Sequence, residues 1–258
     1  MGILNVTPDS FSDGGDAMDA AQAIEAGQRM IAEGAGILDI GGESTRPGAA
    51  PTSPEEERRR VLPVITALAG RGVPLSIDTR NAGTMAAALD AGAAIVNDVS
   101  ALTHDPAAAP LVARRGCPVV LMHMRGTPAT MMAHAAYDDV AAEVRAELAA
   151  RIGAAEAAGV AHSRIAVDPG IGFAKTGEHN IVLLQRLPIL LGLGCRIVVG
   201  ASRKRFIGQL SGTEDVKQRM AGSIAAGLYA LSKGATILRV HDVAATVQAV
   251  RTWQGLAG

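Results

Sequence analysis

Residues 74–98, "PLSIDTRNAGTMAAALDAGAAIVND", contain the pattern that decides the fold. A short apolar run ends at Asp78, an alanine-rich helical stretch follows, and a second apolar run ends at Asn97 and Asp98. Gly92 lies just after the helical stretch, where a residue in the left-handed region commonly ends a helix. Strands that alternate with helices in this way predict parallel βαβ units.

The same unit recurs along the whole chain. Eight apolar runs share the pattern, and they read "GILNV", "GILDI", "PLSID", "AIVND", "PVVLMH", "RIAVD", "RIVVG" and "TILRV". A polar or Gly-rich turn and a helical stretch follow each run, although the helix that contains Pro63 is expected to kink or break there. With 258 residues and 48% hydrophobic content, one domain can bury the whole core. We therefore predict a single-domain (β/α)8 TIM barrel over residues 1–258, with its site at the carboxyl-terminal rim.

Charge and cysteine usage narrow the functional class. Twenty-four Lys and Arg against 25 Asp and Glu leave a net charge of -1, so no basic field predicts nucleic-acid binding. Cys117 and Cys195 match no metal or disulfide spacing, which is typical of a reducing compartment. The N-terminal run "MGIL" is too short for a signal peptide or a membrane span. We expect a soluble cytoplasmic protein without nucleic-acid or membrane partners.

Polar residues follow the strands at the point where each strand ends. They are Asn5, Asp78, Asn97 with Asp98, His123, Asp168, Ser202 with Lys204, and Arg239 with His241. In a barrel these ends share one rim, which is where such enzymes place their sites. One Asp or Asn in this position is more often a helix cap or a turn residue. Polar groups at so many strand ends favour a site.

Four of these residues indicate a flat ligand. Asp78 and Asp168 offer acceptors, Asn97 offers a donor and an acceptor, and Lys204 offers a cation. A carboxylate can accept two parallel N–H bonds from an amidine-like edge, while the amide and the ammonium bind the remaining ring atoms. The set therefore predicts a heterocycle site.

The last strand predicts an anion site beside it. Arg239 and His241 are two residues apart on one strand, so they point the same way and can clamp a phosphate or a carboxylate. Asn5 ends the first strand, next to the last one in a closed barrel. Its neutral oxygen suits Mg²⁺ that is held mainly by substrate phosphates. The rim therefore predicts a site that binds a heterocycle, a phosphate group and a metal ion side by side.

Eight segments in chain order carry a family resemblance. They are "GILNVTPDSFSDGG", "GGESTRPGA", "SIDT", "NDVSA", "LMHMRGTP", "DPGIGFAK", "GASRK" and "RVHDV". Together they cover nearly the whole chain and resemble the bacterial dihydropteroate synthases of the pterin-binding enzyme family; the first two are highly specific, whereas "SIDT" or "NDVSA" alone is weak. The resemblance implies a homodimeric TIM barrel that joins 6-hydroxymethyl-7,8-dihydropterin diphosphate to p-aminobenzoate and releases diphosphate.

The resemblance also implies residue roles. The pterin would contact Asp78, Asn97, Met122, Asp168, Phe173 and Lys204. The p-aminobenzoate would contact Phe11, Thr45, Pro47, Ser202 and Arg205. The diphosphate would contact Asn5, Arg46, Arg239 and His241, with Asn5 also on Mg²⁺. The catalytic set would be Asp13, Arg46, Lys204, Arg239 and His241.

The resemblance has consequences for mechanism and inhibition. Two loops, over about residues 6–18 and 42–54, would order when substrate binds. A dissociative reaction is expected, in which Mg²⁺, Arg239 and His241 stabilise the leaving diphosphate. Since Phe11, Thr45 and Pro47 match the family, sulfonamides are expected to compete with p-aminobenzoate.

Three features depart from the family, and two alternatives stay open. Family members usually have a short segment before the first strand, whereas Met1 opens it here; Arg205 stands where Ser is frequent, and Ala174 stands where Gly is frequent, a change expected to be tolerated. Arg205 either serves a carboxylate or points to solvent.

A methyltransferase of the same barrel class would not need "GGESTRP" or "SRK", and both are present. A non-catalytic pterin-binding homologue would bind ligand without turnover.

Overall fold

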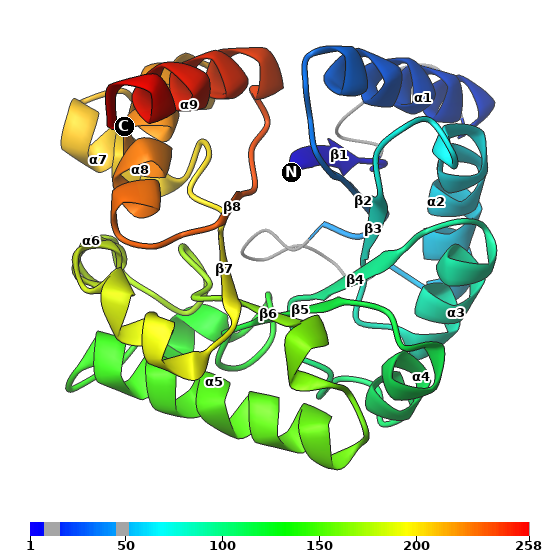
Figure 1. Ribbon diagram of the computed structural model, residues 1–258, viewed down its shortest axis with the longest axis horizontal. Coiled ribbons are helices and arrows are strands. Elements are labelled where there is room, and N and C mark those ends of the chain that lie inside the picture. The colour runs from blue at the N-terminus through cyan, green and yellow to red at the C-terminus, as the bar shows by residue number, and fades with distance from the viewer. Residues whose placement is uncertain (8–15, 45–51, 258) are drawn as a thin grey trace.

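The computed structural model describes residues 1–7, 16–44 and 52–257. Its strands form one parallel sheet in the order β1 to β8, so each strand pairs with the next one along the chain (Figure 1). The strands are β1 (Gly2–Asn5), β2 (Leu38–Gly41), β3 (Leu75–Asp78), β4 (Ile95–Asp98), β5 (Val119–Met122), β6 (Ile165–Asp168), β7 (Arg196–Val199) and β8 (Ile237–Leu238).

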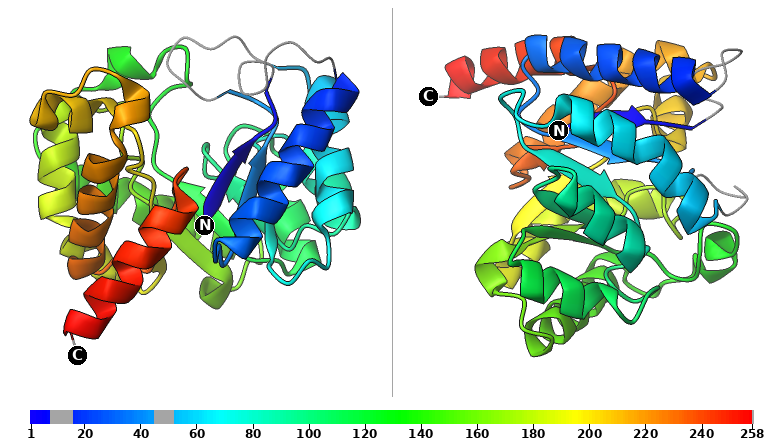
Figure 2. Two further views of the ribbon diagram at one scale, coloured as in Figure 1. Left: turned by 90° about the horizontal axis from the view of Figure 1, so that it is seen from above. Right: turned by 90° about the vertical axis from the view of Figure 1, so that its right-hand side faces the viewer.

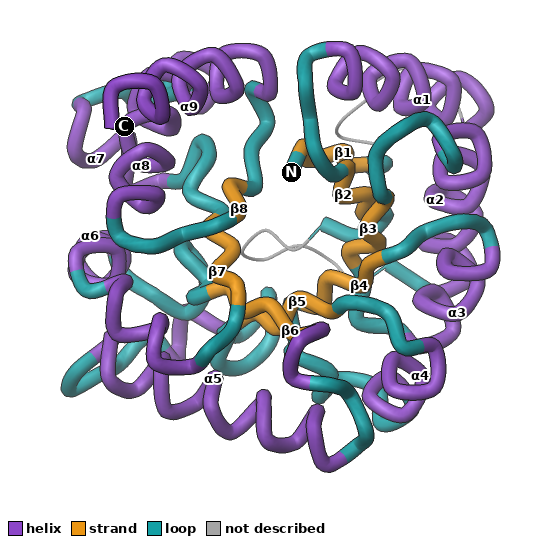
Figure 3. The backbone as a smooth tube through the Cα atoms, viewed as in Figure 1, coloured by secondary structure: helices purple, strands orange, loops and turns teal. Residues whose placement is uncertain are grey.

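Hydrogen bonds beyond the end of β8 close the sheet onto its first strand. Val240 forms a parallel bridge with Gly2. The backbone N–H of Ile3 donates to the carbonyl of Val240, and that of Val240 donates to the carbonyl of Met1, each at 2.9 Å. Figure 3 shows the resulting inner ring of strands with the helices outside it. The predicted (β/α)8 barrel is confirmed.

Helices follow the strands and cover the outside of the ring (Figure 2). They are α1 (Asp16–Ala32), α2 (Pro54–Leu68), α3 (Ala82–Asp90), α4 (Ala108–Arg115), α5 (Val140–Ala157), α6 (Gly177–Gln185), α7 (Arg205–Ser211), α8 (Met220–Ser232) and α9 (Val243–Ala257). Short 3-10 helices are η2 (Met131–His134), η3 (His162–Arg164), η4 (Leu187–Leu193) and η5 (Val216–Gln218). Among the described residues, no helix combines the length and the apolar character that a membrane crossing requires.

The second helix differs from the expectation at Pro63. Helix α2 runs through Pro63 without a break, so of the predicted kink or break the break does not occur. Val61, Val64, Ile65 and Leu68 are all fully buried on one face of this helix. Packing of that face against the barrel outweighs the hydrogen bond that proline removes.

The strand register pairs predicted rim residues on neighbouring strands. Asp78 at the end of β3 is paired with Gly41 of β2 on one side and with Asn97 of β4 on the other. Met122 at the end of β5 is likewise opposite Asp168 at the end of β6. Residues paired across neighbouring strands point to the same face of the sheet, and the contact of Asp78 with Arg239 shows that this face is the barrel interior. The register therefore directs these side chains toward one opening.

Candidate active site

Arg239 follows β8, and its guanidinium lies between two carboxylates. Its Nε donates to Oδ2 of Asp39 at 2.6 Å, and its Nη2 donates to Oδ2 of Asp78 at 2.7 Å. Burial alone lowers the pKa of Arg239, but Asp39 and Asp78 outweigh burial and raise this pKa above its ordinary value. The guanidinium is therefore a permanent cation that joins β8 to β2 and β3 across the barrel.

Asp39 is a site residue that the sequence reasoning missed. It lies inside β2 rather than at the strand end, and it is fully buried. Its Oδ2 accepts a second hydrogen bond, from Nδ2 of Asn97 at 3.0 Å, while its Oδ1 is buried without a partner in the described part of the chain. An Asp inside an apolar run such as "GILDI" could have signalled this, because buried carboxylates are rare unless paired.

Asp78 shares the guanidinium with Asp39 and titrates near neutrality. Burial raises the pKa of Asp78 to about 7; Arg239 opposes the rise, and the charge on Asp39 adds to it. Two carboxylates and one guanidinium carry one negative charge too many for a buried cluster, so one carboxylate tends to hold a proton. A ligand that donates N–H bonds would favour the ionised form of Asp78.

Asp168 ends β6 and is held by the turn that follows. The backbone N–H of Gly170 donates to Oδ1 of Asp168 at 2.7 Å. Burial raises the pKa of Asp168, whereas this hydrogen bond and the charges on Arg239, Lys204 and Lys175 lower it. The carboxylate is thus fixed in orientation, and its ionised form depends on the surrounding cations.

Lys204 and Phe173 form one wall of the opening. The Nζ of Lys204 lies 4.1 Å from the centre of the Phe173 ring, as in a cation–π contact. Burial and the charge on Arg239 together lower the pKa of Lys204 to about 8, against the opposing effect of Asp168 and Asp78. Gly172, at φ 82°, lies beside the Lys204 stem, where a Cβ would come within 3.0 Å of Cδ. The glycine therefore lets the chain approach this stem closely.

His241 is a neutral donor rather than a second cation. Its Nδ1 lies 3.0 Å from Oγ of Ser202, which also accepts the backbone N–H of His241 at 3.3 Å. That arrangement favours donation of the hydroxyl proton to Nδ1, which leaves Nε2 as the N–H donor. Burial lowers the pKa of His241 to about 4, and the charges on Arg203 and Arg239 add to this. Of the two residues predicted to bind an anion, Arg239 is therefore a cation and His241 is a neutral imidazole.

Several predicted residues lie away from this cluster. Asp98 accepts hydrogen bonds from the backbone and hydroxyl of Ser100 and from the backbone of Leu102, so it is a turn-capping residue. Arg205 begins α7, and its side chain is exposed. Met122, by contrast, lies next to the cluster, because it is buried in β5 directly opposite Asp168. The predicted site residues Phe11, Asp13, Thr45, Arg46 and Pro47 lie outside the described residues.

Similarity to known proteins extends over almost the whole chain. The profile of the family described as "Pterin binding enzyme" matches residues 1–241. The dihydropteroate synthase of Mycobacterium leprae is 50% identical over 258 residues, which cover 97% of this chain and 90% of the relative. A Xanthomonas albilineans dihydropteroate synthase solved with 4-aminobenzoic acid has a TM-score of 0.95 and 52% identity, covering 100% of this chain and 92% of that one. The Yersinia pestis dihydropteroate synthase in a sulfonamide drug complex has a TM-score of 0.93 and 44% identity, covering 100% and 93%.

The barrel, its polar rim and the family match define the class of protein. The chain belongs to the pterin-binding enzyme family. Within that family its extensive similarity is to dihydropteroate synthases, so it is an enzyme of that kind, with a condensation reaction in folate biosynthesis. The resemblance read from the sequence motifs is confirmed, and these relatives do not support the methyltransferase alternative.

Proposed function

We propose that this enzyme condenses 6-hydroxymethyl-7,8-dihydropterin diphosphate with p-aminobenzoate, giving 7,8-dihydropteroate and diphosphate in a Mg²⁺-dependent, dissociative reaction. The observation that carries the proposal is the Arg239 guanidinium between Asp39 and Asp78, next to the Lys204–Phe173 wall. One half of this opening offers carboxylates and an aromatic face, and the other half offers a fixed cation. A pterin that carries a diphosphate has the complementary charges.

The pterin half is assigned to four polar side chains. Asp168 is held in orientation by Gly170, and it would accept the N–H groups of the amidine-like edge. Asp78 and Asn97 lie side by side in the register, and they would bind the remaining ring nitrogens. Lys204 would donate to a ring acceptor while the Phe173 ring packs against one face of the heterocycle. Each of these groups is in place before ligand binds, which lowers the ordering cost of binding.

Mg²⁺ fits the diphosphate half only if substrate supplies most of its ligands. Among the described residues, no group of three or more His, Cys, Asp or Glu side chains could hold a metal ion. Half-buried Asn5 at the end of β1 offers one neutral oxygen, which suits an ion bound mainly by phosphate oxygens. When bound, Mg²⁺ would neutralise charge on the leaving diphosphate. Arg46 is a proposed contact of the same group.

The reaction requires little covalent chemistry from the protein. The C–O bond breaks and its electron pair leaves on the diphosphate, where Arg239 and the Nε2–H of His241 stabilise the added charge. The ring system of the dihydropterin delocalises the positive charge on the methylene. The amine nitrogen of p-aminobenzoate then forms the C–N bond and loses one proton. Placement of the amine and exclusion of water account for most of the rate advantage.

We also propose that the enzyme is a homodimer and that sulfonamides compete with p-aminobenzoate. Leu210, Val216, Met220 and Tyr229 are large apolar side chains left 67%, 48%, 44% and 41% exposed along α7, η5 and α8. An exposed apolar group of this kind is typical of an interface between subunits. The sulfonamide proposal rests on the Yersinia pestis complex. An apparent sulfonamide inhibition constant that does not depend on p-aminobenzoate concentration would contradict the competition. A monomeric mass measured by light scattering would contradict the dimer.

The decisive experiment measures diphosphate release from the pterin diphosphate, with and without p-aminobenzoate, and with Mg²⁺ present or chelated. Release that needs both, with dihydropteroate as product, is the expected result. Asp168→Ala should lower turnover about 10-fold or more, because a buried heterocycle loses a paired partner. Turnover of this variant within a few fold of wild type would refute the pterin assignment. Pterin binding without release would instead indicate a non-catalytic homologue.

A further inference from the structure

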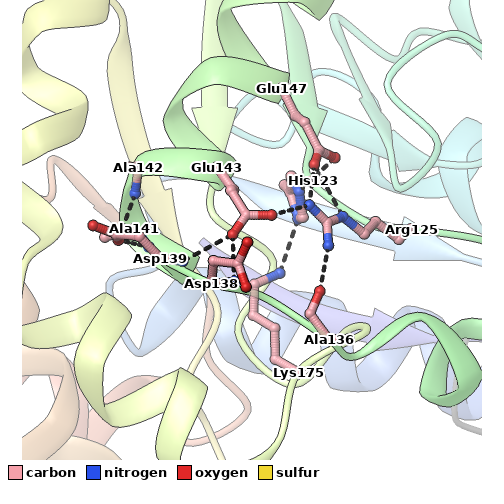
Figure 4. A network of polar contacts seen from close by, with 10 residues as sticks. All are labelled: His123, Arg125, Ala136, Asp138, Asp139, Ala141, Ala142, Glu143, Glu147 and Lys175. Atoms are coloured by element: carbon pink, nitrogen blue, oxygen red, sulfur yellow. Dashed lines mark hydrogen bonds and ion pairs between the residues drawn. The ribbon is translucent and has the colours of Figure 1, made fainter.

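Lys175 is a buried cation that the reaction described above does not use. It lies between β6 and α6, and it is only 3% exposed. Its Nζ is 2.9 Å from Nδ1 of His123 and donates to the carbonyl oxygen of Phe173 at 3.0 Å. No carboxylate among the described residues forms a hydrogen bond or an ion pair with this ammonium. Figure 4 shows that Lys175 approaches the His123 imidazole from the side opposite Glu147.

His123 connects Lys175 to helix α5. The Nε2 of His123 lies 3.0 Å from Oε2 of Glu147, and Arg125 donates through Nε to Oε1 of the same carboxylate at 2.9 Å. Arg125 also donates through Nη2 to Glu143 at 2.7 Å, as the chain of contacts in Figure 4 shows. Burial, helped by the charge on Lys175, lowers the pKa of His123 to about 3, while the charge and the hydrogen bond of Glu147 oppose this shift. A neutral imidazole accepts at Nδ1 from Lys175 and donates at Nε2 to Glu147, so the two contacts require the same tautomer.

The loop after β6 lies directly on this pair of side chains. Gly170 has φ 68°, and a Cβ there would be 1.9 Å from the carbonyl oxygen of His123 and 3.4 Å from Nζ of Lys175. Only glycine permits that approach. The N–H of Gly170 is also the group that fixes Asp168. Lys175 and His123 therefore support a loop that holds both Asp168 and Phe173.

We propose that Lys175 is a positioning residue for the pterin half of the site: it fixes the Phe173 carbonyl and places a positive charge near Asp168, while His123 and Glu147 orient it. This inference rests on the proposed function, since it assigns a role in binding the pterin substrate. Lys175 itself lies beneath the loop and would not contact the substrate.

The charges around the two groups support this role. Burial lowers the pKa of Lys175 to about 7; Asp168 and Glu147 oppose the effect, and Arg125 and Lys204 reinforce it. Conversely, Lys175 is one of three cations, with Arg239 and Lys204, that lower the pKa of Asp168 against burial. A buried ammonium without a carboxylate partner does not favour folding, because an apolar side chain of similar size would be more stable there. The benefit of Lys175 therefore lies in the site.

The test compares Lys175→Met with Lys233→Met. Lys233 follows α8 ahead of β8, at the opposite end of the barrel, so its variant controls for the loss of one lysine. Steady-state diphosphate release is measured between about pH 5.5 and 9, together with thermal unfolding. Lys175→Met is expected to raise KM for the pterin substrate about tenfold, with KM for p-aminobenzoate changed less than about twofold. The acid limb of kcat/KM should move to higher pH, because Asp168 loses a nearby positive charge.

The Lys175→Arg variant is a second, independent test of the role of Lys175. It retains the charge but not the compact ammonium, so the acid limb should stay at its wild-type pH while KM for the pterin substrate rises. An unchanged pterin KM and acid limb in Lys175→Met would overturn the inference. So would a loss of affinity for both substrates that parallels a lower melting temperature, because this pattern is that of a purely structural residue. A wild-type protein that neither binds nor turns over the pterin diphosphate would overturn the proposed function, and the inference with it.

Discussion

Arg239 is a half-buried cation and Lys175 is a buried one, and their surroundings near the barrel rim differ. Arg239 is paired with two carboxylates, Asp39 and Asp78, and its pKa stays above the ordinary value. Lys175 contacts only an imidazole nitrogen and a carbonyl oxygen, and its pKa falls to about 7. The basic guanidinium and its two carboxylate partners keep Arg239 charged, whereas burial without a hydrogen-bonded carboxylate makes Lys175 titratable.

The two arrangements also suit different tasks. A guanidinium that stays charged can meet a diphosphate at any physiological pH, and its fork can exchange carboxylate oxygens for phosphate oxygens. An ammonium with a neutral partner is suited to fixing a loop, and it affects the neighbouring Asp168 through its charge. The following variants test this comparison.

The largest effect is expected for Arg239→Met. Removal of the guanidinium leaves Asp39 and Asp78 buried without a cation, which should lower the free energy of unfolding by about 3 kcal/mol. It should also reduce kcat/KM by about 10²- to 10³-fold, because the leaving diphosphate loses its fixed charge. Urea unfolding and diphosphate release measure the two quantities. Arg239→Lys should lie between Met and wild type, and a Met variant as stable as wild type would contradict the comparison.

Asp39→Asn removes one of the two carboxylates and keeps the shape. We expect kcat/KM to fall on the order of 10-fold and stability to fall by about 2 kcal/mol, because Arg239 and Asn97 lose a charged acceptor. Ser76→Ala is the matched control. Ser76 is paired with Asp39 in the strand register, and its hydroxyl is buried without a partner among the described residues. If both variants behave alike, Asp39 has no special role.

Lys175→Met should change stability in the opposite direction. The pKa of Lys175 is about 7 in the folded protein against an ordinary 10.5, so the unfolded chain binds more protons between these values, and wild-type stability rises with pH there. The loss of stability that comes from burying the charged Lys175 ammonium is complete below about pH 7 and disappears by about pH 10.5. The variant should therefore gain about 1–3 kcal/mol near pH 6 and almost nothing near pH 10. Melting temperatures across this range, with Lys233→Met alongside, measure it; a gain that does not depend on pH would refute the argument.

The smallest effect is expected for Ala174→Gly, next to Lys175. Ala174 has φ 49° and is fully buried. Relief of the left-handed backbone strain is worth about 1 kcal/mol, and loss of a buried methyl group costs about 0.8 kcal/mol. The free energy of unfolding should therefore change by less than about 0.5 kcal/mol, with kcat/KM unaltered. A large change in urea unfolding would show that the turn controls the position of Lys175 by more than backbone angle.

The structure separates two acidic residues that hold the same local position after a strand. Asp78 and Asp98 both end an apolar run and were both counted among the polar rim residues, although only Asp78 was assigned to a ligand. Asp78 contacts Arg239, whereas Asp98 caps the turn through Ser100 and Leu102. A single sequence cannot distinguish these outcomes, because both use the same carboxylate at the same position after a strand.

The sequence by itself determined the eight βα units, the closed barrel and the rim at which polar residues gather, because the alternation of apolar runs and helical stretches is local information. The motifs were enough to identify the family. Only the tertiary structure decided that Asp39 joins the site and that Lys175 faces a neutral histidine. Arg239 and Asp39 are 200 residues apart in the chain, and Lys175 and His123 are 52 apart. Closure of the barrel creates these contacts, and burial then sets the charge of each group.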